Sequence, residues 1–153
     1  MATPQFGQPA PGRVYRDRPA AFGVLEKDGL VALVTVTKPG KAPYLDLPGG
    51  AIEPGEDAAA AMVREFGEET GLSVEAGERL GEADQFFFND DGEPCDNRQT
   101  IFVARFVGES PTLKIEDDHS LTWLPPLEAI ARIRHDSHAW AVALSLRRRA
   151  GRS

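Results

Sequence analysis

The chain of 153 residues is poor in three features: it has one cysteine, Cys95, no long apolar run, and fewer basic than acidic residues. One cysteine excludes an internal disulfide and favours a reducing compartment, so a cytoplasmic location is expected. A transmembrane helix needs about 18 or more apolar residues in a row, so no membrane partner is expected. The formal net charge of −7 argues against a general nucleic-acid binder, which would carry a basic surface. An anionic substrate would therefore need a bound cation to offset like-charge repulsion.

The length fits one domain, and a hydrophobic content of 41% is enough for a real core. Residues 1–12 are rich in Pro, Gly and Gln, which predicts a flexible N-terminal leader. The N-terminus does not have the charged start and apolar stretch of a signal peptide. We therefore expect a single domain over residues 13–153.

Strand-like and helix-like patterns alternate along the chain and predict an α/β (α+β) layered fold with a mixed sheet. Two apolar runs flank Lys27-Asp28-Gly29, and Asp-Gly between such runs predicts a β-hairpin. Further strands are expected over 72–90, 96–108 and 120–125, with a short apolar piece at 44–47. Helices are expected over about 57–70, 127–133 and 137–149.

The helix expected from Asp57 to Thr70 has an unusual distribution of charge. Asp57 is a suitable N-cap and Gly71 a natural residue after the C-terminus. Glu65, Glu68 and Glu69 stand at i, i+3 and i+4, which places three carboxylates on one face of the last two turns. Like charges at this spacing are destabilising, and the negative end of the helix dipole adds to the cost. A divalent cation would resolve the conflict, and Mg²⁺ prefers such oxygen ligands.

The surrounding residues form a longer motif. Its fixed identities are these residues: Gly50, Glu56, Arg64, Glu65, Glu68, Glu69 and Gly71. Its two apolar positions are occupied by Phe66 and Leu72. The segment resembles the Nudix box, G-x5-E-x7-R-E-U-x-E-E-x-G-U, where U is apolar. With each identity at roughly 5–7% background, a chance match is about one in 10⁸ per window, so coincidence is negligible.

The resemblance implies a Nudix-type α/β/α sandwich with a mixed central β-sheet, formed by one Nudix hydrolase domain. It implies that Glu65, Glu68, Glu69 and the backbone of Gly50 hold Mg²⁺, or alternatively Mn²⁺. It further implies that Arg64 and Glu56 hold loop and helix together and orient the carboxylates. A homodimer is compatible with the resemblance, although no feature of the sequence requires one.

The activity implied by the resemblance is hydrolysis of a diphosphate linkage in a soluble nucleoside diphosphate derivative, by attack of water on phosphorus. Candidate substrates are nucleoside triphosphates, normal or oxidised, and nucleotides joined to another group. Glu68 is a candidate for the general base, and the later residues Glu116, Asp117 and Asp118 are the alternative. A non-catalytic nucleotide sensor on the same fold is the competing interpretation, which the complete set of box carboxylates disfavours.

The sequence carries weaker signals for the substrate group that is attached to the diphosphate. Phe86 and Phe88 share one face of an expected strand and are candidates for stacking on a base, with core packing as the alternative. Asp118 is a further candidate for substrate contact. Its neighbour His119 is interpreted as a loop residue, and His135 and His138 as structural or surface residues.

Overall fold

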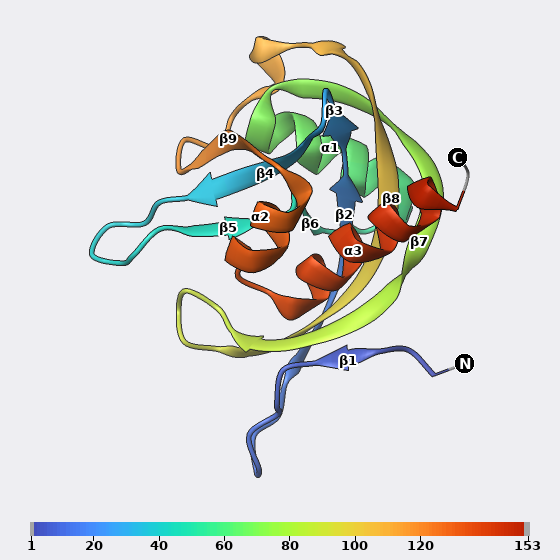
Figure 1. The fold of residues 1–153 in the computed structure, drawn as a ribbon. Coiled ribbons are helices and arrows are strands. Elements are labelled where there is room, and N and C mark those ends of the chain that lie inside the picture. The colour runs from blue at the N-terminus through green and yellow to red at the C-terminus, as the bar shows by residue number, and fades with distance from the viewer. Residues whose placement is uncertain (1, 152–153) are drawn as a thin grey trace.

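The computed structural model describes residues 2–151 (Figure 1), and it confirms the α/β (α+β) class with a mixed sheet. Its strands are divided between two sheets. The five-stranded sheet has the order β1-β7-β8-β2-β6, and the other has the order β3-β4-β5 with β9 paired to β4. The bounds are β1 Gln5–Phe6, β2 Arg16–Val24, β3 Glu26–Lys27, β4 Leu30–Val36, β5 Tyr44–Asp46, β6 Gly49–Ala51, β7 Leu72–Phe88, β8 Pro94–Glu109 and β9 His119–Leu124.

Helices cover the sheets from both sides (Figure 1): α1 Ala58–Thr70 on one side, α2 Pro126–Arg132 and α3 Asp136–Ala150 on the other. The two faces of β2 explain this arrangement, because successive side chains of a strand point to opposite faces. Ala21 packs in the cluster that contains Met62 and Phe66 of α1. Ala20 and Phe22 pack in the cluster that contains Ala141 and Val142 of α3. The layers are those expected of an α/β/α sandwich.

Helix α1 has the caps that its sequence predicts. The Asp57 side chain accepts a hydrogen bond from the Ala60 backbone N–H at 2.7 Å. Gly71 adopts the left-handed conformation with φ 76° and ends the helix. The backbone N–H groups of Ile115 and Glu116 donate to the Glu68 carbonyl oxygen at 3.0 and 3.1 Å. A distant loop thus satisfies a carbonyl at the helix C-terminus, where no intrahelical donor remains.

Tight turns connect the paired strands. Asp28 and Gly29 both have positive φ, 53° and 80°, and form the predicted two-residue hairpin turn between β3 and β4. Strands β7 and β8 form a long antiparallel pair whose turn covers residues 89–93. In Figure 1 this long hairpin curves around the other elements, and its turn lies at the periphery of the molecule.

Part of the segment 1–12 makes specific contacts. Strand β1 pairs in parallel with β7, and the ring of Phe6 lies 5.8 Å from that of Trp140 on α3. The flexibility expected of residues 1–12 stays a prediction. Within residues 2–151, no helix has the length and apolar character needed to cross a membrane.

Candidate active site

The C-terminal half of α1 presents its carboxylates around one cation, Arg64. The Arg64 guanidinium donates to Glu65 and to Glu68, each at 3.1 Å, and to the Ala51 carbonyl oxygen at 3.2 Å. It also makes two hydrogen bonds to Glu56, at 2.8 and 2.9 Å. One guanidinium therefore links the loop before the helix to two carboxylates at the helix end.

The contacts between Arg64 and Glu56 shift the pKa values of both groups. Hydrogen bonding from Arg64 lowers the pKa of Glu56 to about 2, and the same bond raises the pKa of the Arg64 guanidinium. Both groups are therefore charged at neutral pH. Burial raises the pKa of Glu65 above its usual range, since removing a carboxylate from water disfavours its charged form.

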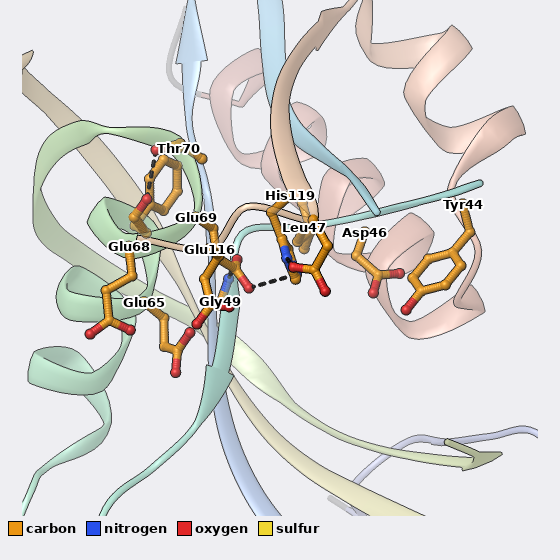
Figure 2. A network of polar contacts seen from close by, with 12 residues as sticks. Tyr44, Asp46, Leu47, Gly49, Glu65, Glu68, Glu69, Thr70, Glu116 and His119 are labelled. Carbon is orange, nitrogen blue, oxygen red and sulfur yellow. Dashed lines mark hydrogen bonds and ion pairs between the residues drawn. The ribbon is translucent and has the colours of Figure 1, made fainter. Parts of the chain in front are cut away.

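Glu69 lies apart from this cluster and faces a different set of partners. Its Oε1 accepts a hydrogen bond from the Gly49 N–H at 3.0 Å, and its Oε2 lies 3.2 Å from His119 Nε2. Figure 2 shows Glu69 between the Gly49 backbone and the His119 ring, while Glu65 and Glu68 point away from that ring. The three carboxylates share one helix face as predicted, yet their tips are held by different elements.

His119 is a part of the site that the sequence interpretation missed. It is the first residue of β9, and its Nδ1 lies 2.7 Å from Asp118 Oδ1. With a carboxylate at each ring nitrogen, the pKa of His119 is raised to about 9, chiefly by the bond to Glu69. Burial raises the pKa of Glu69 to about 7. The only local signal was an acidic pair followed by histidine at the start of an expected strand.

The loop before β9 brings more acidic groups to the site. Glu116, Asp118 and His119 offer ligand atoms that lie within 4.8 Å of one another. Asp118 is bound by the Lys38 ammonium group and by His119, and the bond from Lys38 lowers the pKa of Asp118 to about 2. A carboxylate with so low a pKa is a weak proton acceptor at neutral pH. Glu116 is consequently a better base candidate than Asp118.

Gly50 leaves the space that the neighbouring carboxylate occupies. A Cβ at this position would lie 2.7 Å from Cδ of Glu65 and 2.9 Å from its Oε2. Any larger residue at position 50 would therefore displace the Glu65 carboxylate. The absence of a side chain at Gly50 thus fixes how closely β6 and α1 approach at the site.

The donor set suits a hard divalent cation. Glu65, Glu68 and Glu69 supply carboxylate oxygens on one helix face, and Glu116 lies on a loop whose backbone binds to the Glu68 carbonyl. Oxygen ligands of this kind are those that Mg²⁺ and Mn²⁺ accept. Arg64 and His119 offset part of the negative charge at this helix C-terminus, and a cation would offset more of it. The oxygen donors thus suit a metal ion in kind, although within residues 2–151 only Glu116, Asp118 and His119 bring three ligand atoms within 4.8 Å of one another.

A cavity of about 620 Å³ opens beside Gly49, Gly50 and Glu69. Its walls come from β2, β5, β7, β8, β9 and the start of α3. They carry both acidic side chains, Asp46, Asp90 and Asp91, and several basic ones: Arg16, Arg18, Lys38, Lys41 and Arg134. The volume lies within the range of about 300–1,000 Å³ that is usual for small-molecule sites. Basic groups inside a protein of net charge −7 indicate an anionic ligand.

The three consecutive rings of Phe86, Phe87 and Phe88 do not lie as the predicted base stacking requires. Phe87, rather than Phe86 or Phe88, lines the cavity. Phe86 and Phe88 lie on the other face of β7, where both rings pack against Tyr15 at 5.5 and 6.1 Å. The alternation of the strand, which was correctly expected to separate Phe87 from its neighbours, decides which ring meets a ligand.

Two histidines form part of the cavity wall. His135 and His138 are buried, and their rings lie 5.3 Å apart. Burial lowers the pKa of His135 to about 3 and that of His138 well below its usual value, so both are neutral. The Leu47 N–H donates to His138 Nδ1 at 3.2 Å. This bond joins α3 to the strand segment that leads into Gly49.

Comparisons with known proteins agree with this geometry. A protein of Bacillus subtilis with the provisional description 8-oxo-dGTP diphosphatase is 30% identical over 93 residues, which are 61% of this chain and 58% of that protein. An RNA pyrophosphohydrolase of Dinoroseobacter shibae is 32% identical over 111 residues, which cover 61% of this chain and 69% of the relative. The matches thus span between about half and two thirds of these relatives.

The structural likeness covers more of the chain. A NUDIX hydrolase from Nitrosomonas europaea superposes with a TM-score of 0.72 at 24% identity, over 85% of this chain and 88% of the other. The sequence model of the NUDIX domain matches residues 15–144, which contain α1, every strand except β1 and most of α3. This chain belongs to the NUDIX domain family.

Proposed function

We propose that the protein is a metal-dependent pyrophosphohydrolase that cleaves a diphosphate linkage in a nucleotide by attack of water on phosphorus. The observation that carries this proposal is the position of Glu69, which lines a cavity with several basic side chains, on the helix face that also carries Glu65 and Glu68. An acidic metal site beside a basic cavity matches an anhydride with phosphate at one end and an anionic or polar group at the other. The names of the relatives, which are diphosphatases and pyrophosphohydrolases, support the same reaction class.

In this proposal Glu65, Glu68, Glu69 and the Gly50 backbone hold Mg²⁺ or Mn²⁺. The bound cation would neutralise the diphosphate and lower the pKa of an attacking water. Arg64 and Glu56 keep the carboxylates in position through the hydrogen bonds that they share. Such positioning matters because misplacement of a reacting group by about 1 Å can cost on the order of 10²-fold in rate.

The proton of the attacking water needs an acceptor. Glu68 is our first candidate, because it lies on the same helix face as the other two carboxylates and is only partly buried. Glu116 is the alternative from the later loop. Asp118 is disfavoured as the base because Lys38 holds its pKa at about 2. In this proposal Asp118 instead anchors Lys38 and His119 at the cavity wall.

The preferred substrate class is a free nucleotide in the cytoplasm. A net charge of −7 disfavours extended contact with a polyanion such as RNA, since such contact needs a broad basic surface. The cavity nevertheless has room for the 5′ end of an RNA, the substrate named for several relatives. Nucleoside triphosphates and triphosphorylated RNA are therefore separate arms of the test.

The test is turnover of a panel with Mg²⁺ or Mn²⁺, with and without a chelator. The panel contains normal and oxidised dNTPs, ADP-ribose, nucleotide sugars, dinucleoside polyphosphates, NADH, coenzyme A and triphosphorylated RNA. Glu69→Gln is the matched variant: it keeps the size of the side chain and removes its charge. We expect metal-dependent release of monophosphate, pyrophosphate or phosphate by the wild type and a loss of roughly 10²- to 10⁴-fold in the variant.

Two results would contradict the proposal. Equal turnover by Glu69→Gln, with an unchanged melting temperature, would remove the site assignment. Binding of nucleotides without turnover of any panel member would instead favour the nucleotide sensor.

A further inference from the structure

Arg18 is a partly buried cation in the cavity wall that forms no ion pair with a carboxylate among the described residues, and Glu65 and Glu69 act on it only at longer range. Its Nη1 donates a hydrogen bond to the neutral Asn97 Oδ1, at 2.8 Å. By contrast, Arg134 makes two bonds to Asp46, and Lys38 is paired with Asp118. Because a guanidinium carries five N–H donors, most of the hydrogen-bonding capacity of Arg18 remains unused by the protein. A ligand in the cavity is the natural acceptor.

Asn97 is held in one orientation by this contact. Strands β2 and β8 run in parallel with Arg18 and Asn97 in register, so the two side chains are neighbours on one face of the sheet. Arginine has no acceptor, and the Asn97 atom that faces it must therefore be the amide oxygen. Asn97 keeps both N–H donors of its amide and a second lone pair on the oxygen. The pair as a whole therefore offers mainly donors to a ligand.

A third donor lies in the same wall. His138 is neutral and accepts the Leu47 N–H at Nδ1, which places the ring proton on Nε2. The Nε2 atom is buried and has no hydrogen-bond partner in residues 2–151. Three carboxylates of the cavity wall are bound elsewhere: Asp46 by Arg134, Asp90 by the Tyr44 hydroxyl, and Glu69 by the Gly49 N–H and His119.

The same cavity has flat apolar walls. Phe22, Tyr44 and Phe87 line it, and the Arg134 guanidinium lies 3.7 Å from the centre of the Tyr44 ring. Aromatic rings and stacked guanidinium groups are surfaces on which nucleobases pack. A base in this position has its phosphates directed toward Glu69 and Gly49, which line the same cavity.

We propose that Arg18, positioned by Asn97, is a specificity-determining residue that binds the keto edge of a nucleobase and selects guanine and uracil nucleotides over adenine and cytosine nucleotides. The inference rests on the proposed function and names the substrate class of that site. Guanine O6 and N7 and uracil O4 are acceptors that match the donors of Arg18. Adenine and cytosine carry an amino group where the keto oxygen would be, and donor then meets donor.

Asparagine often recognises adenine, because its oxygen accepts from the adenine amino group while its NH₂ donates to N7. Here one lone pair of the Asn97 oxygen accepts from Arg18, and the positive guanidinium beside it disfavours the approach of a second donor such as the adenine amino group. The hydrogen bond between the two residues therefore positions Arg18 for the recognition of keto bases.

The test measures binding and turnover separately. Full-length protein with Mg²⁺ is titrated calorimetrically with the α,β-methylene analogues of GTP, UTP, ATP and CTP, and turnover of the parent nucleotides is measured in parallel. We expect the GTP and UTP analogues to bind roughly 10- to 100-fold more tightly than the ATP and CTP analogues. Arg18→Gln, whose amide offers both donor and acceptor, should lose this preference and retain the affinity for the ATP analogue.

Two further variants keep the result interpretable. Arg98→Gln is the matched control, because Arg98 follows Asn97 on β8 and forms an exposed ion pair with Asp17 outside the cavity. It should keep the wild-type preference. If Arg18→Gln fails to fold, Arg18→Lys retains the charge but not the planar fork, and it should show a reduced preference.

Each outcome tests either the inferred base preference or the proposed hydrolase function. A wild type that binds all four analogues equally overturns the inference, even if it hydrolyses them. Equal weakening of all four analogues in Arg18→Gln also overturns it, since Arg18 would then bind phosphate. A preference for keto bases without any turnover leaves the inference standing and removes the proposed hydrolase function.

Discussion

The two ends of the cavity differ in how they are built. The end beside α1 is charged and comes largely from one stretch of sequence, with Glu65, Glu68 and Glu69 on a single helix face. The remaining wall is lined by neutral histidines, aromatic rings and the Arg18–Asn97 pair, which come from five different elements. The contrast suggests a division of roles: the proposed chemistry needs a fixed local motif, whereas recognition of the attached group is assembled from distant strands.

Gly50→Ala is the sharpest way to disturb the charged end without changing any charge. The added Cβ would lie 2.7 Å from Cδ of Glu65, so the flexible carboxylate must move while the backbone remains in place. We expect turnover to fall by about 10²-fold with little change in melting temperature. Gly108→Ala is the control, because nothing lies within 4 Å of its added Cβ. Normal turnover by Gly50→Ala would show that the position of Glu65 is not critical.

Arg64→Lys tests whether the charged end depends on a planar fork rather than on positive charge. Lysine cannot reproduce the simultaneous bonds to Glu56, Glu65 and Glu68. We expect a decrease of roughly 10- to 100-fold in the apparent affinity for Mn²⁺, measured by titration of the metal against turnover and by calorimetry. Arg105→Lys, at an exposed ion pair with Glu75, should behave like the wild type. An unchanged Mn²⁺ affinity in Arg64→Lys would limit Arg64 to a structural role.

His138→Asn examines the neutral end through its pH dependence. Burial holds the pKa of His138 well below its unfolded value, so its contribution to stability is present above about pH 6.5 and is lost as the pH falls. Each such histidine should lower the free energy of unfolding by about 1 kcal/mol between pH 7.5 and pH 5.5. Asparagine keeps an acceptor for the Leu47 N–H but does not titrate.

The measurement is urea denaturation of wild type and variant at pH 7.5 and pH 5.5. The variant should lose less stability than the wild type between these two values, because one of its two buried histidines is gone. An identical loss in both proteins would mean that His138 is already accessible to protons in the fold, and the cavity would not have the neutral wall that the structure shows.

The helix caps and the β3–β4 turn were predictable because they depend on neighbouring residues. Asp57, Gly71 and the Asp28-Gly29 pair act through local backbone geometry, which the sequence encodes directly. The face of β7 that carries Phe87 was also predictable from alternation. Which of the two faces borders a cavity was not, since that depends on where α3 and the 89–93 turn lie.

By itself, the sequence determined the family, the three carboxylates on one helix face and the layered α/β architecture, because a spaced motif and periodic patterns carry this information locally. Only the tertiary structure decided that His119 meets Glu69, fifty positions earlier in the chain, and that Arg18 meets Asn97, which is 79 positions away. Such contacts depend on the pairing and register of strands that are distant in sequence. No local pattern encodes them, and the choice of substrate is expected to rest on them.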